Sequence, residues 1–381
     1  MEFDNLLKLM VDKEASDLFV TVGVPPSIKI NGKVYPVGKV ALTEDASRAL
    51  VEGVMDEPQR AEFNQKKELN FAISSQWGAR FRVSAFYQRN DVGMVLRRIE
   101  DRIPTVDELN LPPILNDLVM TKRGIIIFVG ATGTGKSTSL AAMIGHRNRN
   151  SKGHIISVED PIEFVHQHEG CIITQREVGV DTESFEVALR NTLRQAPDVI
   201  LIGEIRTRET MEHAITFAET GHLVLATLHA NNANQALDRI QHFFPAERHT
   251  QLWMDLSLNL RAMIAQQLIP TIDGKGRRAA IEILINTPLV SDLIRKGEVH
   301  KLKELMTRSR EQGMQTFDQA LYDLYNEGII SYEDALASAD SKNDLRLLIK
   351  LQNETDTNKL EGSTDDLLVS EEDPGQNFFR P

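Results

Sequence analysis

The sequence contains a single cysteine, Cys171, and has no long apolar run. One cysteine excludes an internal disulfide and a cysteine-rich zinc site, and it fits a reducing cytoplasm. The longest clear apolar run, at 125–129, has the length of a strand, so no transmembrane helix is expected. The start of the chain, Met1-Glu2-Phe3-Asp4, lacks the positive charges and apolar stretch of a secretory signal. These absences predict a cytoplasmic protein.

Positive charge is also scarce. The chain has 43 lysines and arginines against 55 aspartates and glutamates, a formal net charge of -12. Eight acidic and two basic residues lie at 353–381, so this tail holds half of the net charge. Phosphate backbones need concentrated Lys and Arg, and the acidic balance therefore argues against a nucleic-acid partner.

The first part of the chain, residues 1–100, is predicted to form a small α+β domain. Strands are expected at 17–24, 27–30, 33–37, 69–74, 79–87 and 93–99. The turn Asn31-Gly32 has hairpin chemistry, and Thr43 is the expected N-cap of a helix at 43–55. A linker at 101–117 follows and contains three prolines, Pro104, Pro112 and Pro113.

From residue 118 to 285, short apolar strands alternate with amphipathic helices. Strands are expected at 125–129, 155–158, 199–202 and 223–228, with helices from 136 and at 184–195 and 208–219. This alternation predicts a mostly parallel sheet with helices on both faces. Beyond 231 the pattern turns mainly helical, and one late strand is expected at 278–285. Four apolar residues spaced by four predict a helix stripe: Leu252, Leu256, Leu260 and Ile264.

The last part of the chain divides into a helical C-terminal subdomain at 286–352 and an acidic tail at 353–381. Helix start signals stand at Thr316, Ser331 and Ser341. The tail is polar, and we expect it to be disordered. Its two aromatic residues, Phe378 and Phe379, form either a frayed end or a short docking motif.

A phosphate-binding loop is predicted between the apolar run at 125–129 and the helix that begins near 136. The sequence matches G-x-x-x-x-G-K-[ST] in full, after a strand and before a helix. Glycines let backbone N–H groups curl around a β-phosphate, and the helix N-terminus adds positive potential. Lys136 is expected to reach the β- and γ-phosphates of ATP, and the Ser137 hydroxyl to ligate Mg²⁺. The predicted ATP-binding residues are Gly130, Ala131, Thr132, Gly133, Thr134, Gly135, Lys136, Ser137 and Thr138.

Carboxylates at two other strand ends predict hydrolysis. The stretch at 197–204 is similar to a Walker B strand, and Glu204 at its carboxyl end can orient and polarise an attacking water. Gly203 stands where other P-loop proteins often carry an aspartate, so Mg²⁺ needs Ser137, water and another acid. The segment at 159–163 has three carboxylates and is expected to meet the P-loop in one cleft. A solvated acidic turn is the alternative.

Two histidines flank the strand at 223–228, His222 before it and His229 after it. A histidine at a strand end can sense a γ-phosphate by a hydrogen bond, which is a stronger prediction for His229 than for His222. Developing phosphate charge is often neutralised by an arginine from a neighbouring subunit. Arginines on predicted strands or on one helix face, with surface salt bridges as the alternative, are Arg80, Arg82, Arg97, Arg190 and Arg194.

The segments at 130–137, 159–163, 197–204 and 220–231 occur together in this order and spacing. With them the chain resembles the secretion-superfamily ATPases, whose corresponding elements are the Walker A, Asp box, Walker B and His box. It is most similar to the PilT/PilU branch, the type IV pilus retraction motors, over about residues 1–350. The resemblance implies an α/β fold with a RecA-like P-loop ATPase core, a smaller PAS-like α+β N-terminal domain and a helical C-terminal region.

The same resemblance implies a homo-hexameric ring that binds ATP between the two domains. It places the protein in the cytoplasm, peripheral at the inner-membrane base of the pilus machine, where the partner is the inner-membrane pilus platform protein. By this resemblance Glu163 lies near the Mg²⁺ ion, which the Ser137 hydroxyl is expected to ligate. The residues that it assigns to catalysis are Glu204, Glu163, His229, His222, Arg82 and Arg97.

The chain departs from PilT-type motors in one helix. Those motors read A-I-R-N-L-I-R-E, whereas residues 289–296 here read L-V-S-D-L-I-R-K. This departure and the acidic extension beyond 353 are most similar to the PilU members of the branch. The similarity implies an accessory retraction ATPase that works with a PilT-like ATPase.

Two other functions are compatible with a P-loop. A RecA-like nucleic-acid translocase is disfavoured by the acidic balance and by the lack of a basic, aromatic-rich stripe. A nucleotide-gated scaffold that binds ATP and barely cleaves it is disfavoured by Glu204, Lys136 and Ser137.

Overall fold

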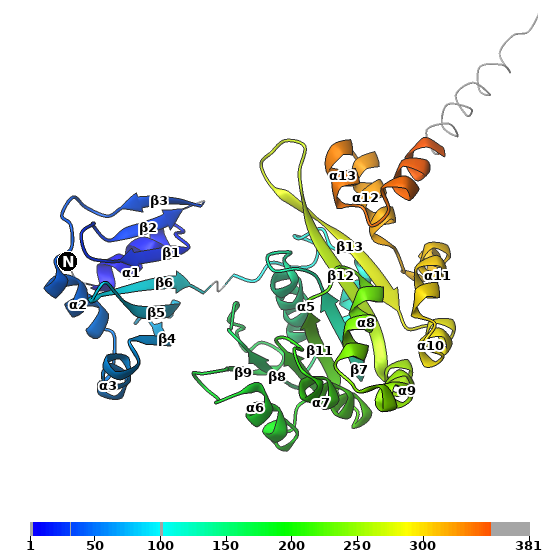
Figure 1. Cartoon of the computed structure of the whole chain (residues 1–381), viewed down its shortest axis with the longest axis horizontal. Helices are drawn as coiled ribbons and strands as arrows, with labels where there is room; N and C mark the ends of the chain where they lie inside the picture. Colours follow the sequence, from blue (N-terminus) through cyan, green and yellow to red (C-terminus); the bar gives the residue numbers. More distant parts are fainter. Residues whose placement is uncertain (1–2, 31, 100–101, 352–381) are drawn as a thin grey trace, which may run out of the picture.

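An antiparallel sheet of six strands forms the N-terminal part of the computed structural model, which describes residues 3–30, 32–99 and 102–351. The strand order is β3-β2-β1-β6-β5-β4. Figure 1 shows this sheet at one end of the molecule. The strands are β1 (Asp17–Val20), β2 (Ser27–Ile30), β3 (Lys33–Pro36), β4 (Glu68–Ser74), β5 (Arg80–Gln88) and β6 (Asp91–Arg98), and the helices are α1 (Phe3–Asp12), α2 (Glu44–Glu52) and α3 (Glu57–Lys66).

The sequence predicted these strands and α2, but not α1 or α3. Thr43 caps α2 as expected, since its side chain accepts a hydrogen bond from the Ala46 N–H. Helix α3 has Phe63 as its one buried residue, so it lacks an apolar stripe, and a capping box between Asp56 and Gln59 starts it. The hairpin of β2 and β3 forms as predicted, although Asn31 of its turn lies outside the described residues.

A seven-stranded sheet forms the core, in the order β13-β12-β7-β11-β10-β8-β9. Its strands pair in parallel except for β13, which is antiparallel to β12. The strands are β7 (Gly124–Val129), β8 (His154–Glu159), β9 (Ile172–Glu177), β10 (Val199–Ile202), β11 (Leu223–Leu228), β12 (Leu260–Pro270) and β13 (Arg277–Ile285). The helices are α4 (Ile114–Val119), α5 (Lys136–Asn150), α6 (Phe185–Thr192), α7 (Arg208–Glu219), α8 (Ala233–His242) and α9 (His249–Asn259), with short 3₁₀ turns at Leu193–Gln195 and Ala246–Arg248.

Both faces of this sheet are covered, as the alternation of strands and helices predicted. Every residue of β7 and β11 is buried. Alternate residues of β7 point to opposite sides: Ile125 and Ile127 join one hydrophobic cluster, and Ile126 and Phe128 join another. The predicted α/β fold, with a separate N-terminal sheet, is therefore confirmed.

The predicted helix stripe that ended at Ile264 is wrong. Leu252 and Leu256 do lie on α9, but Leu260 and Ile264 belong to β12, which pairs with both β7 and β13. A spacing of four residues puts side chains on one face of a strand as well as on one face of a helix, so the pattern fits both. Strand β9 was also missed.

The C-terminal part is helical, as predicted. Its helices are α10 (Pro288–Arg295), α11 (Leu302–Arg308), α12 (Phe317–Asn326) and α13 (Tyr332–Ser338), with 3₁₀ turns at Val299–Lys301 and Arg310–Gln312 and a last helical stretch at 342–351. Thr316, Ser331 and Ser341 all accept hydrogen bonds from backbone N–H groups at helix starts, as their sequence context predicted. The acidic tail at 353–381 lies outside the described residues, and the exact domain boundaries stay predictions.

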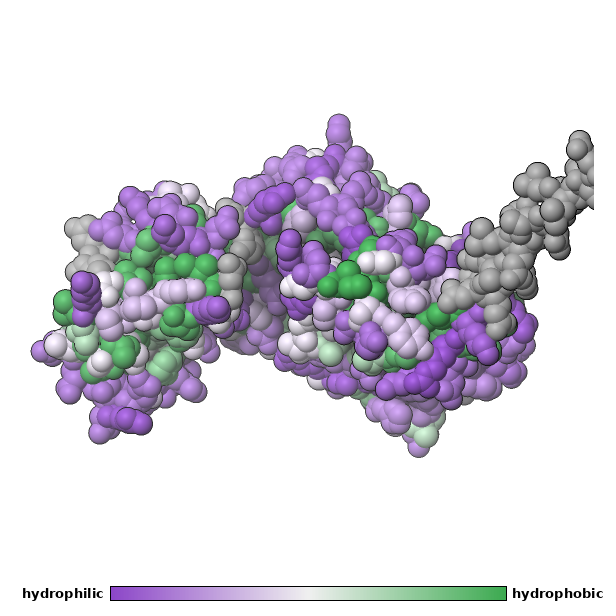
Figure 2. Space-filling view, turned by 90° about the horizontal axis from the view of Figure 1, so that it is seen from above, coloured by the Kyte–Doolittle hydropathy of each residue, from purple (hydrophilic) through white to green (hydrophobic). Residues whose placement is uncertain are grey.

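Hydrophilic side chains surround smaller hydrophobic areas on the face seen from above (Figure 2). In the described part of the chain, no helix combines the length and the apolar character that crossing a membrane requires.

Candidate nucleotide-binding site

The phosphate-binding loop lies between the carboxyl end of β7 and the start of α5. Gly135 caps the helix with φ of +86°, a left-handed conformation that glycine adopts without strain. The Lys136 ammonium folds back into the loop, where it donates to the carbonyl oxygens of Gly130 at 2.8 Å and Ala131 at 2.7 Å. Burial lowers the pKa of Lys136, while the nearby carboxylates of Glu204 and Glu163 act to raise it.

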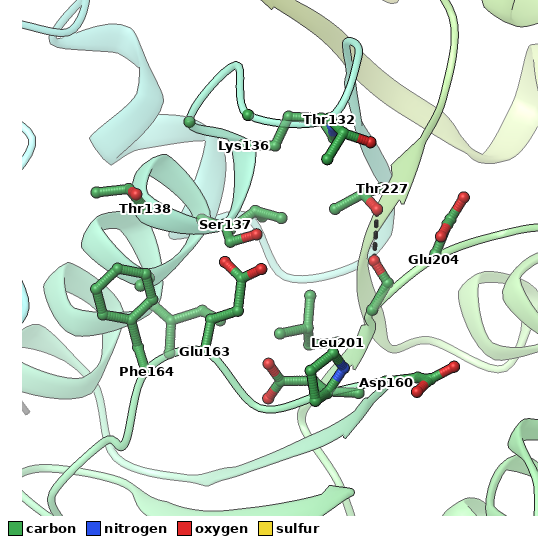
Figure 3. A pocket seen from close by; sticks show the side chains of 18 of the residues that line it. Thr132, Lys136, Ser137, Thr138, Asp160, Glu163, Phe164, Leu201, Glu204 and Thr227 are labelled. Carbon is green, nitrogen blue, oxygen red and sulfur yellow. Dashed lines mark hydrogen bonds between the residues drawn. The ribbon is translucent and has the colours of Figure 1, made fainter. Parts of the chain in front are cut away.

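The loop opens onto a pocket of about 480 Å³. Four neighbouring strands end here, because the carboxyl ends of parallel strands share one edge of a sheet. β7 leads into the loop, and the segments that follow β8, β10 and β11 contribute Glu163, Glu204 and His229, respectively. The structure therefore brings these three predicted residues and the P-loop to one site. Figure 3 shows Glu163 and Glu204 there with Lys136 and Ser137 of the loop.

Glu204 is held from two sides. His229 Nε2 lies 3.1 Å from Glu204 Oε1, and His229 Nδ1 lies 3.2 Å from the carbonyl oxygen of Gly130. The carbonyl oxygen and the ionised carboxylate both accept only, so each contact is made through an N–H of the imidazole ring. His229 thus connects the carboxylate with the first residue of the P-loop.

Arg206 holds the other side of Glu204 and was missed in the sequence. Its Nε donates to Glu204 Oε2 at 2.7 Å, and its guanidinium lies 3.6 Å from Asp160 Oδ2. The sequence feature that could have identified Arg206 is its position two residues after Glu204, just beyond the end of β10. Arg206 therefore joins the acidic ends of β8 and β10.

The three acids at the end of β8 and in the segment that follows it have different surroundings. Glu159 accepts hydrogen bonds from Ser157 at 2.6 Å and Gln175 at 3.2 Å, and burial raises its pKa to about 7. Asp160 faces Arg206. The Glu163 carboxylate points toward the Ser137 hydroxyl (Figure 3). Of the three, Glu163 is the acid placed beside the P-loop serine.

Ser137 and Glu163 offer hard oxygen donors on one side of the pocket, which suits Mg²⁺. No group of three or more His, Cys, Asp or Glu residues forms a metal site within the described ranges. Mg²⁺ commonly takes one or two protein ligands and completes its shell with substrate phosphates and water. The donor set therefore fits a magnesium ion that arrives with a nucleotide.

Three predicted residues lie away from this pocket. His222 precedes β11, opposite the end that His229 follows, and its Nδ1 lies 3.1 Å from both the Phe217 carbonyl oxygen and Thr220 Oγ1. Residues that flank one strand lie at opposite ends of it, one at its amino end and the other at its carboxyl end. The structure thus does not bring His222 to the pocket that His229 lines.

Arg82 and Arg97 are direct partners on β5 and β6. Arg97 Nε donates to Asp17 Oδ1 at 2.8 Å, inside the N-terminal sheet. Arg82 reaches the core: it donates to the Ile162 carbonyl oxygen at 3.1 Å, and its Nε lies 3.8 Å from Glu177 Oε1. Arg82 is thus anchored one residue before Glu163.

Sequence reasoning also missed the part of the pocket that comes from β12 and β13. Leu268 and Arg277 line it, and Gln266 donates to the carbonyl oxygen of Thr134 in the P-loop. The apolar spacing at 252–264 predicts a helix there, so nothing in the sequence placed this strand beside the loop.

Comparison with known proteins identifies relatives of the whole chain. Residues 54–337 match the family described as Type II/IV secretion system protein. The type IV pilus ATPase PilU of Pseudomonas aeruginosa is 69% identical, with 100% of both chains covered. The type IV pilus retraction ATPase PilT of the same organism is 40% identical over 89% of this chain and 98% of its own. A crystal structure of the pilus retraction motor PilT with bound ADP is similar with a TM-score of 0.85 at 38% identity, covering 91% of this chain and 99% of that one.

Proposed function

The chain belongs to the type II/IV secretion system proteins, among the type IV pilus ATPases, and on this premise we propose that it is a Mg²⁺-dependent ATPase that drives or assists pilus retraction. One observation carries the hydrolytic part of the proposal. Glu204, held by His229 and Arg206, lines the same pocket as Lys136. A carboxylate in that position can orient a water against a terminal phosphate.

Each residue of the pocket has a separate task in this proposal. Lys136 exchanges the carbonyls of Gly130 and Ala131 for phosphate oxygens when ATP enters. Ser137 and Glu163 would hold Mg²⁺, which would neutralise phosphate charge. His229 keeps Glu204 oriented against the P-loop.

The N-terminal sheet supplies the coupling to movement. Arg82 contacts the segment that carries Glu163, and this contact links the sheet to the phosphate end of the pocket. We propose that ATP draws Arg82 and Arg97 toward the phosphates and that hydrolysis releases them. The catalytic role that the resemblance assigns to His222 stays a proposal, and in this structure its side chain contacts Thr220 and Phe217 outside the pocket.

The proposed assembly is a homo-hexamer in the cytoplasm, peripheral at the inner-membrane base of the pilus machine. Its proposed partners are a PilT-like ATPase and the inner-membrane pilus platform protein, without nucleic acid. The relatives named as pilus ATPases support this placement, as does the departure from PilT-type sequence at 289–296.

The test compares Mg²⁺-dependent ATPase activity of the wild type, Lys136→Ala and the exposed control Lys152→Ala. Light scattering gives the mass of each with and without nucleotide. Turnover that Lys136→Ala alone abolishes, with a mass near six subunits, supports the proposal. A monomer without turnover contradicts an autonomous motor and indicates a subunit that works only with another ATPase.

A further inference from the structure

Gln266 lies where β12 passes the phosphate-binding loop. β12 runs parallel to β7 up to the pair Ala265 and Val129, so Gln266 follows directly beside Gly130. The residue is 2% exposed. Polar side chains this deeply buried keep specific hydrogen bonds, because an unpaired polar atom costs free energy there.

Both ends of the Gln266 amide are engaged at the junction of loop and helix. Its Nε2 donates to the carbonyl oxygen of Thr134 at 2.8 Å, and its Oε1 accepts from Ser139 Oγ at 2.8 Å. A Cβ on Gly135 would lie 2.7 Å from the same Nε2. One side chain thus fixes the last loop peptide and the first turn of α5, and Gly135 leaves the room for it.

The bond to Thr134 has a consequence for the next residue. The carbonyl of Thr134 and the N–H of Gly135 belong to one planar trans peptide, so they point in opposite directions. Anchoring the carbonyl on β12 therefore directs the Gly135 N–H away from β12. Gly135 lines the nucleotide pocket, and P-loops bind phosphate through backbone N–H groups.

We propose that Gln266 is a positioning residue for nucleotide binding, which holds the Thr134–Gly135 peptide in its phosphate-binding orientation before ATP arrives. The inference rests on the proposed function, because it assumes that the pocket binds ATP. A preorganised loop does not lose conformational freedom on binding, so the contribution is to affinity. The preorganised loop binds substrate and transition state equally well. Loss of the Gln266 hydrogen bonds should therefore raise KM and leave kcat unchanged.

The test measures the affinity of the full-length chain for ATP and ADP by calorimetry, with KM and kcat from steady-state turnover. Gln266→Met keeps length and removes both hydrogen bonds, and about tenfold weaker binding is expected, with kcat within about twofold. Hydrogen exchange at 131–136 in the nucleotide-free protein should accelerate. Asn286→Ala is the control, because Asn286 is another side-chain amide that donates to backbone carbonyls. Its two partners, Ser257 and Leu260, lie at the end of β12 that is far from the loop. Its affinity and its exchange at 131–136 should stay at the wild-type values.

Ser139→Ala provides a second variant if Gln266→Met fails to fold. It removes the hydroxyl that orients the Gln266 amide, so a smaller weakening in the same direction, roughly two- to threefold, is expected. A wild type that binds nucleotide, with variants that bind equally well and exchange equally slowly, overturns the inference about Gln266. A wild type that binds no nucleotide contradicts the proposed function itself.

Discussion

Arg206 and Glu204 form an ion pair at the mouth of the pocket, with Arg206 Nε 2.7 Å from Glu204 Oε2. Because His229 lies beside the other oxygen, the carboxylate is oriented on both sides. Arg206 keeps 57% of its side chain exposed, whereas Glu204 keeps 13%. The carboxylate is thus largely shielded from solvent, whereas its arginine partner is not.

Replacing Arg206 with alanine is expected to lower kcat about tenfold, because a carboxylate that has lost its orienting partner places water less well. Nucleotide affinity should stay within about twofold, since Lys136 and the P-loop are untouched. Arg208→Ala is the matched control, because Arg208 pairs with Glu212 on α7 instead. Steady-state turnover and calorimetry distinguish the two variants, and equal kcat in both would show that Arg206 does not position Glu204.

Replacing Arg82 with alanine is expected to destabilise the protein by about 1–3 kcal/mol, because Glu177 is a buried carboxylate beside it. The loss should also speed proteolysis between β6 and α4, where the N-terminal sheet joins the core. Denaturant unfolding and limited proteolysis measure these effects. The control Arg308→Ala breaks an exposed surface pair with Glu304 and should change stability by no more than about 0.5 kcal/mol. Additive effects of Arg82→Ala and Glu177→Gln would contradict the pairing.

Glu282 predicts a pH-dependent stability. Burial, with a smaller effect from Asp340, raises its pKa from 4.5 to about 7, and the carboxylate accepts a hydrogen bond from the Ala233 N–H at 2.7 Å. Between pH 4.5 and pH 7 the folded chain binds more protons at Glu282 than the unfolded chain does. The contribution of protonated Glu282 to stability is therefore complete below pH 4.5 and is lost as pH rises through 7. The loss amounts to about 3 kcal/mol.

Glu282→Gln keeps the acceptor for Ala233 and removes the titration. Its unfolding free energy should therefore fall less than that of the wild type between pH 5 and pH 8. Glu304→Gln, at an exposed carboxylate paired with Arg308, should follow the wild type. Parallel curves for Glu282→Gln and the wild type would contradict the raised pKa.

The sequence predicted the fold and the family because their signals are local or follow from sheet topology. The P-loop needs only a strand, a loop and a helix in order. Glu163, Glu204 and His229 follow three parallel strands, so topology alone brings them to one edge. The predicted membership of the PilT/PilU family is confirmed by relatives that match the length of the chain.

The rest of the site depends on contacts that no short pattern specifies. The four-residue spacing at Leu260 and Ile264 fits a helix and a strand equally, and with β12 unrecognised, Gln266 had no visible partner. Arg206 carries the charge of many surface arginines, and only its place in the fold directs it to Glu204. Arg82 contacts a core segment 80 residues away in the sequence.

The most direct test of hydrolysis at this pocket is the ATPase activity of Glu204→Gln, measured with its affinity for ATP. The amide keeps the size of the side chain and removes the negative charge that orients and polarises water. We expect kcat to fall about 10²- to 10⁴-fold with ATP affinity within about threefold of wild type, while Glu219→Gln on the exposed end of α7 turns over normally. Turnover of Glu204→Gln within a few-fold of wild type would contradict the assignment of Glu204 as the catalytic carboxylate.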